Sequence, residues 1–240
     1  MRRTGVVAVP LLGLLVACGG GQADGRAGPR PSPEPTAPAA AAAEAAVGRE
    51  ELEAAAFEAG TRVGGFAVSA FALDGPSYDE LEYRADRAVC QPLVSLAPGA
   101  TETDPGATVN RRVELGDGVM APKVDVQLRS YPEGGAEAVL AALRTAGTAC
   151  GDGFTEDRTL ARAPVLAVTG AAAPDAGDES VAFRLEVRDV KDPDTVFTEY
   201  LTVVRVGTVT AAFRLEPLDE EDHGRVPDVV VAEQLGRLTG

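Results

Sequence analysis

The feature of this sequence that most restricts its fold is the alternation of residues in two neighbouring segments. The alternate positions are Val109, Arg111, Val113 and Leu115 in the first segment and Val124, Val126, Leu128 and Ser130 in the second, and all but Arg111 and Ser130 are apolar. Gly116-Asp117-Gly118 lies between the two segments. Alternation with a period of two predicts strands that are buried on one side only. Glycine and aspartate favour tight turns, so we expect the two strands to form an antiparallel pair with a short loop.

Further strands are predicted on either side of this pair. Asp192-Pro193-Asp194 and Gly207 indicate turns between three alternating segments near the C-terminus. Two shorter apolar segments predict one more strand and a short edge strand. The predicted strands are residues 66–73, 164–168 (the short edge strand), 181–187, 195–206 and 209–215.

Two helices are predicted from apolar periodicity. Within Glu133–Ala149, apolar residues recur at the i, i+3, i+4, i+7 spacing of a helix that packs one face onto a sheet. A last helix should begin at Pro227, because proline fits the first helical turn, where its missing N–H has no effect. Its buried residues are expected to be Val231, Leu235 and Leu238.

Two earlier segments predict helix less regularly. Arg49–Ala59 predicts a short helix that stops at Gly60. Asp79–Leu96 predicts helix in parts, and Pro92 should interrupt it, so that Gln91 becomes a boundary.

Together these elements predict an α+β fold, in which a mostly antiparallel sheet is packed with helices. Hydrophobic residues make up 45% of the chain, which is enough for a core. We expect residues 49–240 to form a single extracytoplasmic domain.

The first 17 residues predict a secretory signal. Arg2 and Arg3 provide a positive start, and the apolar run that follows is too short to span a bilayer. The run ends in Leu15-Val16-Ala17-Cys18, which resembles the lipobox of bacterial lipoproteins. That resemblance implies cleavage before Cys18 and attachment of acyl chains, such as palmitate, to this cysteine. The alternative is an ordinary secreted protein cleaved near Ala17.

Residues 18–48 predict a tether between the lipidated Cys18 and the domain. This segment is rich in glycine, proline and alanine, so it contains too little apolar surface to form a core. The expected location is therefore the cell membrane, lipid-anchored, on its extracytoplasmic side.

The net charge of −15 has the wrong sign for binding nucleic acid. The two remaining cysteines, Cys90 and Cys150, are expected to form a disulfide, because paired cysteines in exported proteins usually do. A two-cysteine metal site is the alternative, but the spacing matches no zinc motif. We therefore predict no metal and no cofactor.

No catalytic residue is predicted. The only histidine, His223, lies in a charged segment, Asp219–Gly224, and there is neither a Gly-x-Ser-x-Gly elbow nor a phosphate-binding glycine loop. Acidic residues near Asp189 and Asp219 are typical of charged turns and lack a calcium-loop pattern. A pair of catalytic carboxylates would be defined only by tertiary structure, so a hydrolase remains an alternative.

Arginine is frequent on the polar side of the predicted strands. If the strands share one sheet, that side would be a lattice of arginine and glutamate. Such a lattice can be simply a solvated face with weak cross-strand pairs, or it can bind an anionic or polar ligand or a partner protein. The candidate residues are Arg112, Arg129, Arg184, Arg188 and Arg214.

Two segments resemble known proteins. Ala85–Leu93 and Ser130–Phe154, each containing one of the paired cysteines, are similar to extracytoplasmic lipoproteins of actinobacteria and, more loosely, to the extracellular sensor domain of PknH-type protein kinases. The resemblance implies a PsbP-like sandwich of helices and antiparallel sheet, with a groove for an unidentified ligand. This chain has one candidate disulfide where that family commonly has two.

From these observations we expect a membrane-anchored, non-enzymatic lipoprotein domain that binds an unknown envelope ligand or protein. A cell-envelope hydrolase with an unrecognised carboxylate site is one alternative. A structural spacer lipoprotein without a ligand is the other.

Overall fold

The structure is a computed structural model that describes residues 46–70, 83–94, 101, 103–118, 120–158 and 161–240. All of these residues belong to one compact unit, residues 42–240. The predicted signal, Cys18 and most of the predicted tether lie outside the described residues. No helix in the described part of the chain is both long enough and apolar enough to cross a membrane.

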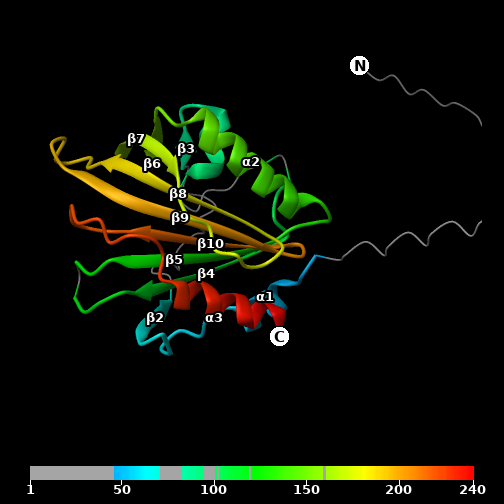
Figure 1. The fold of residues 1–240 in the computed structure, drawn as a ribbon. Coiled ribbons are helices and arrows are strands. Elements are labelled where there is room, and N and C mark those ends of the chain that lie inside the picture. Colours follow the sequence, from blue (N-terminus) through cyan, green and yellow to red (C-terminus); the bar gives the residue numbers. More distant parts are fainter. Residues whose placement is uncertain (1–45, 71–82, 95–100, 102, 119, 159–160) are drawn as a thin grey trace, which may run out of the picture. The chain divides into compact units, whose positions relative to one another are not determined.

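Ten strands form one antiparallel sheet (Figure 1). Their order across the sheet is β1-β2-β4-β5-β10-β9-β8-β7-β6-β3. The strands are β1 (Arg62–Val63), β2 (Phe66–Ala70), β3 (Arg84–Ala85), β4 (Ala107–Glu114), β5 (Lys123–Ser130), β6 (Phe154–Arg158), β7 (Ala161–Gly170), β8 (Glu179–Arg188), β9 (Val196–Val206) and β10 (Val209–Glu216).

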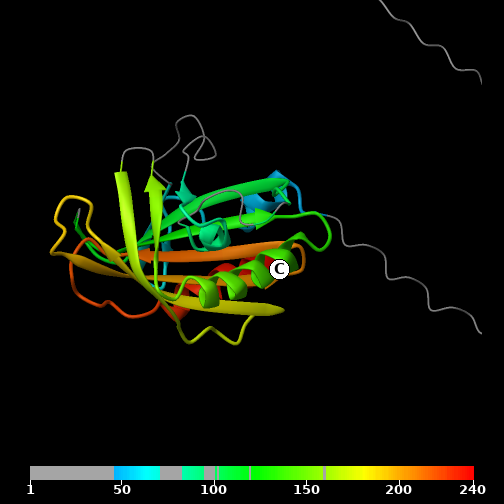
Figure 2. The same ribbon diagram turned by 90° about the horizontal axis from the view of Figure 1, so that it is seen from above.

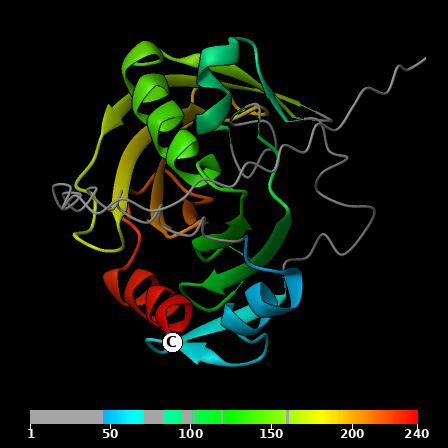
Figure 3. The ribbon, with the colours of Figure 1, turned by 90° about the vertical axis from the view of Figure 1, so that its right-hand side faces the viewer.

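Helices cover the two faces of the sheet at different places. The helix α2 (Gly135–Ala149) and the 3-10 helix η2 (Ala88–Leu93) pack on one face, whereas α1 (Arg49–Ala55) and α3 (Asp228–Thr239) pack on the opposite face. Figure 3 shows these two helical layers with the strands between them. Viewed from above in Figure 2, α2 lies in front of the sheet and α3 behind it. We call the two sides the α2 face and the α3 face.

The core on the α2 face lies beneath the helix that the sequence predicts most clearly. Val139, Leu140 and Leu143 of α2 are buried in one cluster with Phe183 and Leu185 of β8. The helix approaches the sheet closely because Gly147 has no side chain: a Cβ there would lie 2.2 Å from Cε1 of Phe183.

The core on the α3 face uses other strands. Val113 of β4, Val126 of β5 and Phe213 of β10 are buried in one cluster with Val230 and Val231 of α3. A buried glutamine, Gln234, links the two helices of this layer, because its side-chain amide binds the carbonyl of Ala55 and the N–H of Phe57.

β9 belongs to both cores. Leu201 and Val203 point into the α2-face core, whereas Val204 points into the α3-face core. The buried side of the sheet therefore changes at this strand: β8 turns its apolar residues toward α2, and β10 turns its apolar residues toward α3.

The structure confirms the predicted α+β fold and most of its elements. β4 and β5 pair antiparallel, α2 and α3 lie where periodicity predicts them, and β8, β9 and β10 follow in order. In α3 the buried residues include Val231 and Leu235 as predicted, while Leu238 is only partly buried. The Phe66–Leu73 strand is β2 as far as Ala70, and residues 71–73 lie outside the described part.

Three local predictions are wrong. The 164–168 segment is not an edge strand, because β7 is longer and lies between β8 and β6, and β6 was not predicted. The segment 79–96 is described only at residues 83–94, where β3 replaces helix and Pro92 lies inside η2 instead of ending a helix at Gln91. A short 3-10 helix tolerates this proline: the N–H groups of Cys90 and Val94 bond to the carbonyls of Arg87 and Gln91, three residues earlier, and neither bond needs the proline nitrogen.

Candidate functional site

A polar surface occupies the part of the α2 face formed by β4, β5 and β10. On these strands the alternate residues fill the α3-face core, so the period of two directs their polar neighbours to the α2 face. We call this surface, with Glu199 of β9, the polar half-face. Its main members are Asn110, Arg112, Glu114, Lys123, Asp125, Gln127, Arg129, Thr210, Arg214, Glu199 and Glu216.

Arg214 lies at the centre of the polar half-face and is 0% exposed. Its Nε and Nη2 donate to the Glu199 carboxylate at 2.9 and 2.5 Å, and its Nη1 donates to the carbonyl of Leu93 at 2.9 Å. The Glu216 carboxylate lies 3.2 Å from Nε. A buried guanidinium needs such partners, because an uncompensated buried charge is strongly destabilising.

The surrounding carboxylates keep Arg214 charged. Burial by itself would lower the pKa of Arg214, but the negative charges of Glu199, Glu156 and Glu216 outweigh it and raise the pKa above its ordinary value. Glu156, from β6, is itself 0% exposed. Arg214 therefore works as a buried, permanently charged centre for acidic groups from three strands.

Beside this centre, Arg112 and Asp125 form a bidentate pair across β4 and β5. Arg112 Nε lies 2.5 Å from Asp125 Oδ1, and Arg112 Nη2 lies 2.8 Å from Asp125 Oδ2. The Asp125 side chain is 4% exposed and that of Arg112 is 22% exposed. Burial, reinforced by Glu216, raises the pKa of Asp125 to about 6 even though Arg112 and Arg214 favour its ionised form.

The rim of the polar half-face consists of further donor–acceptor pairs. Gln127 Nε2 donates to Asn110 Oδ1 at 3.0 Å, and the Ser69 hydroxyl donates to Glu114 at 3.2 Å. Lys123 Nζ lies 4.0 Å from Glu114. Gln127 is buried like Asp125 and Arg214 of the floor, whereas the side chains of β4, Lys123 and Glu216 are partly exposed and form the accessible part of the rim.

The predicted disulfide is confirmed, and it positions a segment over Arg214. Cys90 and Cys150 are bonded, with their Cα atoms 5.9 Å apart, which joins η2 to the end of α2. Arg87 adds hydrogen bonds to the carbonyls of Ala149 and Gly153. Because Leu93, at the end of η2, supplies the carbonyl that accepts from Arg214, the disulfide helps to hold this acceptor in place.

The structure divides the five predicted arginines between two faces. Arg112, Arg129 and Arg214 lie on the polar half-face, where Arg129 faces Thr108 and Thr210 in the strand register. Arg184 and Arg188 lie on the α3 face, because β8 buries its alternate residues toward α2. The single lattice expected from the sequence is therefore wrong.

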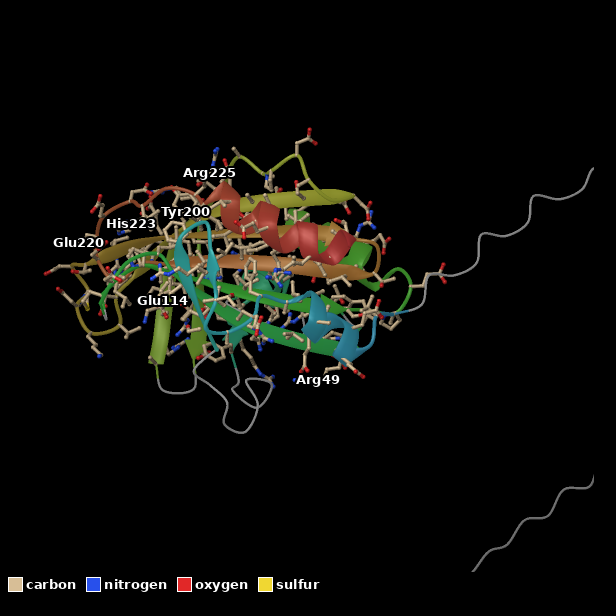
Figure 4. The ribbon with its side chains drawn as sticks, turned by 90° about the horizontal axis from the view of Figure 1, so that it is seen from below. Arg49, Glu114, Tyr200, Glu220, His223 and Arg225 are labelled. Atoms are coloured by element: carbon tan, nitrogen blue, oxygen red, sulfur yellow. A yellow bond between two sulfur atoms is a disulfide. The ribbon has the colours of Figure 1, made fainter. Side chains whose placement is uncertain are left out.

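On the α3 face, Arg184 belongs to a separate group that we call the exposed arginine cluster: Arg184, Glu186, Thr198, Tyr200 and Asp222. Arg184 donates to Glu186 at 2.6 Å, to Thr198 at 3.1 Å and to Asp222 at 3.4 Å, and the Tyr200 hydroxyl donates to Asp222 at 2.9 Å. Figure 4 shows Tyr200 and His223 near each other beside the segment that joins β10 to α3.

Hydrogen bonds fix the segment between β10 and α3. The Gly224 N–H, the Tyr200 hydroxyl and Arg184 bind Asp222, and they lower its pKa despite slight burial. His223 Nε2 lies 2.7 Å from Asp219 Oδ1. The histidine thus contacts its own segment, in accord with its assignment to a charged turn.

No metal site is evident in the described residues, where no three His, Cys, Asp or Glu side chains come together suitably. The acidic group around Asp189 instead forms a turn, since Asp189 Oδ1 accepts from the N–H groups of Lys191 and Asp192.

Glu199 and Glu156 are site residues that sequence reasoning missed. Glu199 lies in the 195–206 run, which is apolar at both odd and even positions, and this double apolar pattern is the signal that β9 is buried on both sides. A glutamate within such a run must have a buried cationic partner. For Glu156 no comparable signal exists, because β6 is largely polar.

Comparison with known proteins gives evidence at the level of fold. No protein-family model and no curated protein match the chain. Among solved structures, the extracellular domain of PknH from Mycobacterium tuberculosis matches with a TM-score of 0.50 and 11% identity, over 81% of this chain and 97% of that chain. An uncharacterised protein from Mycobacterium smegmatis, the Rv0999 ortholog, matches with a TM-score of 0.27 and 15% identity, over 58% and 67% of the two chains.

The first of these matches confirms the resemblance that the sequence suggests. The second has too low a TM-score to support an argument. In its fold, this chain is thus loosely similar to the extracellular domain of an actinobacterial protein, PknH.

Proposed function

We propose that this chain is an extracytoplasmic, non-enzymatic binding domain, and that it recognises an envelope ligand or partner protein through the polar half-face. A lipid on Cys18 would anchor it to the cell membrane. The fold likeness to the PknH extracellular domain and the Leu15–Cys18 lipobox support this location.

The observation that carries the proposal is the paired charge on the polar half-face. Arg112 and Arg214 are held by carboxylates on a buried floor, next to a partly exposed rim that includes Asn110 and Glu114. A rigid array of donors and acceptors of this kind is a means of recognising a polar surface with little loss of side-chain entropy on binding.

Site-specific crosslinking in intact cells tests the proposal. A photoreactive residue at Asn110, on the rim, should capture one defined envelope component, whereas the same residue at Glu186, in the exposed arginine cluster, should not. Equal capture from both positions, or none from Asn110, would contradict the assignment of the polar half-face.

A paired substitution supplies the matched control. Arg112→Gln with Asp125→Asn replaces the ion pair by neutral amides of similar shape and should abolish capture from Asn110. Arg184→Gln with Glu186→Gln makes the same change on the α3 face and should leave capture unchanged. Thermal unfolding of both variants shows whether the domain remains folded.

The proposed anchor has its own test. Cys18→Ala should move the protein from the membrane fraction to the medium, because the variant lacks the acylation site and therefore the two or three acyl chains that would hold it firmly on the membrane. Mass spectrometry of the membrane-bound chain should find the acyl mass on Cys18. Membrane retention of the alanine variant would contradict lipidation at this residue.

One observation favours the hydrolase alternative: Asp125 has a raised pKa and shares its face with Glu156, Glu199 and Glu216. A carboxyl group that is protonated in mildly acidic medium can serve as a general acid. A panel of ester, peptide and glycoside substrates tests it. Turnover that disappears in Asp125→Asn would support the hydrolase. If neither turnover nor a crosslinked envelope component is found, the remaining alternative, a structural spacer lipoprotein without a ligand, would be favoured.

A further inference from the structure

A cavity of about 350 Å³ opens on the α3 face, between the first half of α3 and the loop that joins β7 to β8. In Figure 4, Arg225, which lines this cavity, lies beside the start of α3 and this loop. The walls are aliphatic and are formed by four alanines, one proline and two valines, among them Ala176, Val231 and Ala232. Its volume is within the range of small-molecule binding sites.

Hydrogen bonds hold the loop wall of the cavity in place. The Ser180 hydroxyl donates to the carbonyl of Pro174 at 2.6 Å, and the Asp178 N–H donates to the carbonyl of Arg205 at 2.8 Å. Gly177 has a φ of +65°, and a Cβ there would collide with the carbonyl of Arg205. On the other wall, α3 is packed into the α3-face core. The cavity is therefore a preformed part of the fold.

Inside the cavity lies the buried side chain of Thr202, from β9, which is 5% exposed. On the same side of β9, Thr198 accepts a hydrogen bond from Arg184. The Tyr200 hydroxyl donates to Asp222. Among the described residues, by contrast, the Thr202 hydroxyl has no hydrogen-bond partner. A buried hydroxyl without a partner costs free energy, so a polar ligand atom in the cavity would supply a missing interaction.

The mouth of the cavity carries more negative than positive charge. Arg225 Nη2 donates to Asp228 Oδ2 at 2.7 Å, so the charges of this exposed pair largely cancel. Asp175 lines the same cavity, is exposed and has no ion-pair partner in the described part of the chain. The remaining charge at the mouth is negative and favours a cationic ligand group over an anionic one.

We propose that this cavity is a second binding site, and that it takes a small aliphatic molecule with an ammonium group at one end and a hydroxyl or carbonyl oxygen at the other. The aliphatic chain contacts the alanine and valine walls. The oxygen bonds the Thr202 hydroxyl, and the ammonium group lies at the mouth near Asp175. This site is independent of the proposed function, because it lies on the opposite face of the sheet and shares no residue with the polar half-face.

An NMR titration with 5-amino-1-pentanol tests the site. Saturable shifts are expected for the amide resonances of residues 172–176 and 226–232. The anionic analogue 5-hydroxypentanoate should bind about fivefold more weakly, because the mouth repels its carboxylate. Asp175→Asn should weaken binding of the amino alcohol by about threefold. Absence of saturable shifts in these segments, or equal affinity for the two molecules, would overturn the proposal.

Thr202→Val tests the inner hydrogen bond, because valine has nearly the same shape as threonine and lacks the hydroxyl. The variant should bind 5-amino-1-pentanol about fivefold more weakly, as expected for the loss of one hydrogen bond. Pentylamine has no oxygen and should bind the variant and the wild type with the same affinity. If the substitution weakens both molecules equally, or neither, the proposal is wrong.

A matched pair of substitutions tests the location. Ala232 lies on the exposed side of α3 and lines the cavity, so Ala232→Leu should fill the mouth and abolish binding. Ala141→Leu makes the same change on the exposed side of α2 and should leave binding unchanged. Leucine is a good helix former, so both variants should remain folded, which thermal unfolding checks. Binding that survives Ala232→Leu would contradict the site, and the crosslinking experiment tests the polar half-face separately.

Discussion

The two arginine–carboxylate groups of this domain contain similar residues in different environments. On the polar half-face, Arg214 is 0% exposed and Asp125 is almost fully buried. In the exposed arginine cluster, the side chains of Arg184 and Asp222 are 31% and 46% exposed. The same ion pair should therefore contribute differently on the two faces, because water screens the exposed group but not the buried one.

The two aspartates show the difference most directly. Burial raises the pKa of Asp125, whereas hydrogen bonds from Gly224, Tyr200 and Arg184 lower the pKa of Asp222. Asp125 has lost its solvation, and this loss outweighs the two hydrogen bonds from Arg112, whereas Asp222 has kept most of its solvation and gained donors. The environment, and not the residue type or the number of arginines nearby, therefore decides whether the pKa of the aspartate is raised or lowered.

Removing Arg214 should give the largest effect of any single substitution considered. Arg214→Leu leaves Glu199, Glu156 and Glu216 without their shared cation and should lower the free energy of unfolding by about 3–5 kcal/mol. This corresponds to a fall in Tm of about 10 °C for a domain of this size. Chemical denaturation measures it, and a loss below 1 kcal/mol would mean that the site is not buried. Adding Glu199→Met to the variant should recover part of the loss.

Removing the disulfide should have the next largest effect. Cys90→Ala with Cys150→Ala should lower the free energy of unfolding by about 2–4 kcal/mol, because the bond closes a loop of 60 residues. Since η2 supplies the Leu93 carbonyl to Arg214, hydrogen exchange should increase in η2 and leave the segment 219–225 unchanged. Increased exchange in both places would show that the two faces are coupled.

The pH dependence of stability should distinguish the two aspartates by sign. The pKa of Asp125 is about 6 in the folded chain and about 3.9 when unfolded, so the folded protein binds this proton more strongly. The contribution of Asp125 to the free energy of unfolding is fully present below about pH 4. It is lost as the pH rises through 6, and the total loss is about 3 kcal/mol. Comparing urea denaturation of wild type and Asp125→Asn from pH 4 to 7 isolates this slope.

For Asp222 the sign is opposite. Its lowered pKa contributes stability above the unfolded value of about 4, and that contribution is lost as the pH falls through the folded pKa. Asp222→Asn should therefore reduce stability at neutral pH and have little effect in strong acid. If the stability contribution of Asp222 instead fell with rising pH, as that of Asp125 should, the two faces would not differ in the way proposed.

The smallest effect is expected for Arg184→Leu. Its partners Glu186 and Asp222 are solvated, so the free energy of unfolding should change by less than about 1 kcal/mol. This variant is the matched control for Arg214→Leu. If both substitutions lower the free energy of unfolding by the same amount, burial does not determine how much these ion pairs contribute to stability.

The sequence predicts the individual strands well because alternation is a local property. The alternation marks Val109 and Val113 as buried, and both are buried in β4, whereas Arg111 at the same alternate positions is only partly buried. Alternation does not show toward which helices a strand turns its apolar side. Arg112 and Arg184 both lie at positions that alternate with the buried apolar residues of their strands. They nevertheless lie on opposite faces of the sheet, because the face toward which apolar side chains point changes at β9.

The buried floor of the site was less predictable for a related reason. Asp125 and Arg214 look like ordinary solvated positions, and only the pairing of β5 with β10 brings them opposite each other. Their burial depends on segments distant in sequence, among them η2, which the Cys90–Cys150 bond holds in place. A local pattern contains no information about such contacts.

The arrangement of the α3-face core also determines when, during synthesis of the chain, the domain can fold. Val68, Val113 and Val126 enter the core early in the chain, but Phe213 and Val230 close it. Contacts of such large sequence separation form slowly. The first half of the domain must therefore wait, with its apolar side unburied, until almost the entire chain has emerged.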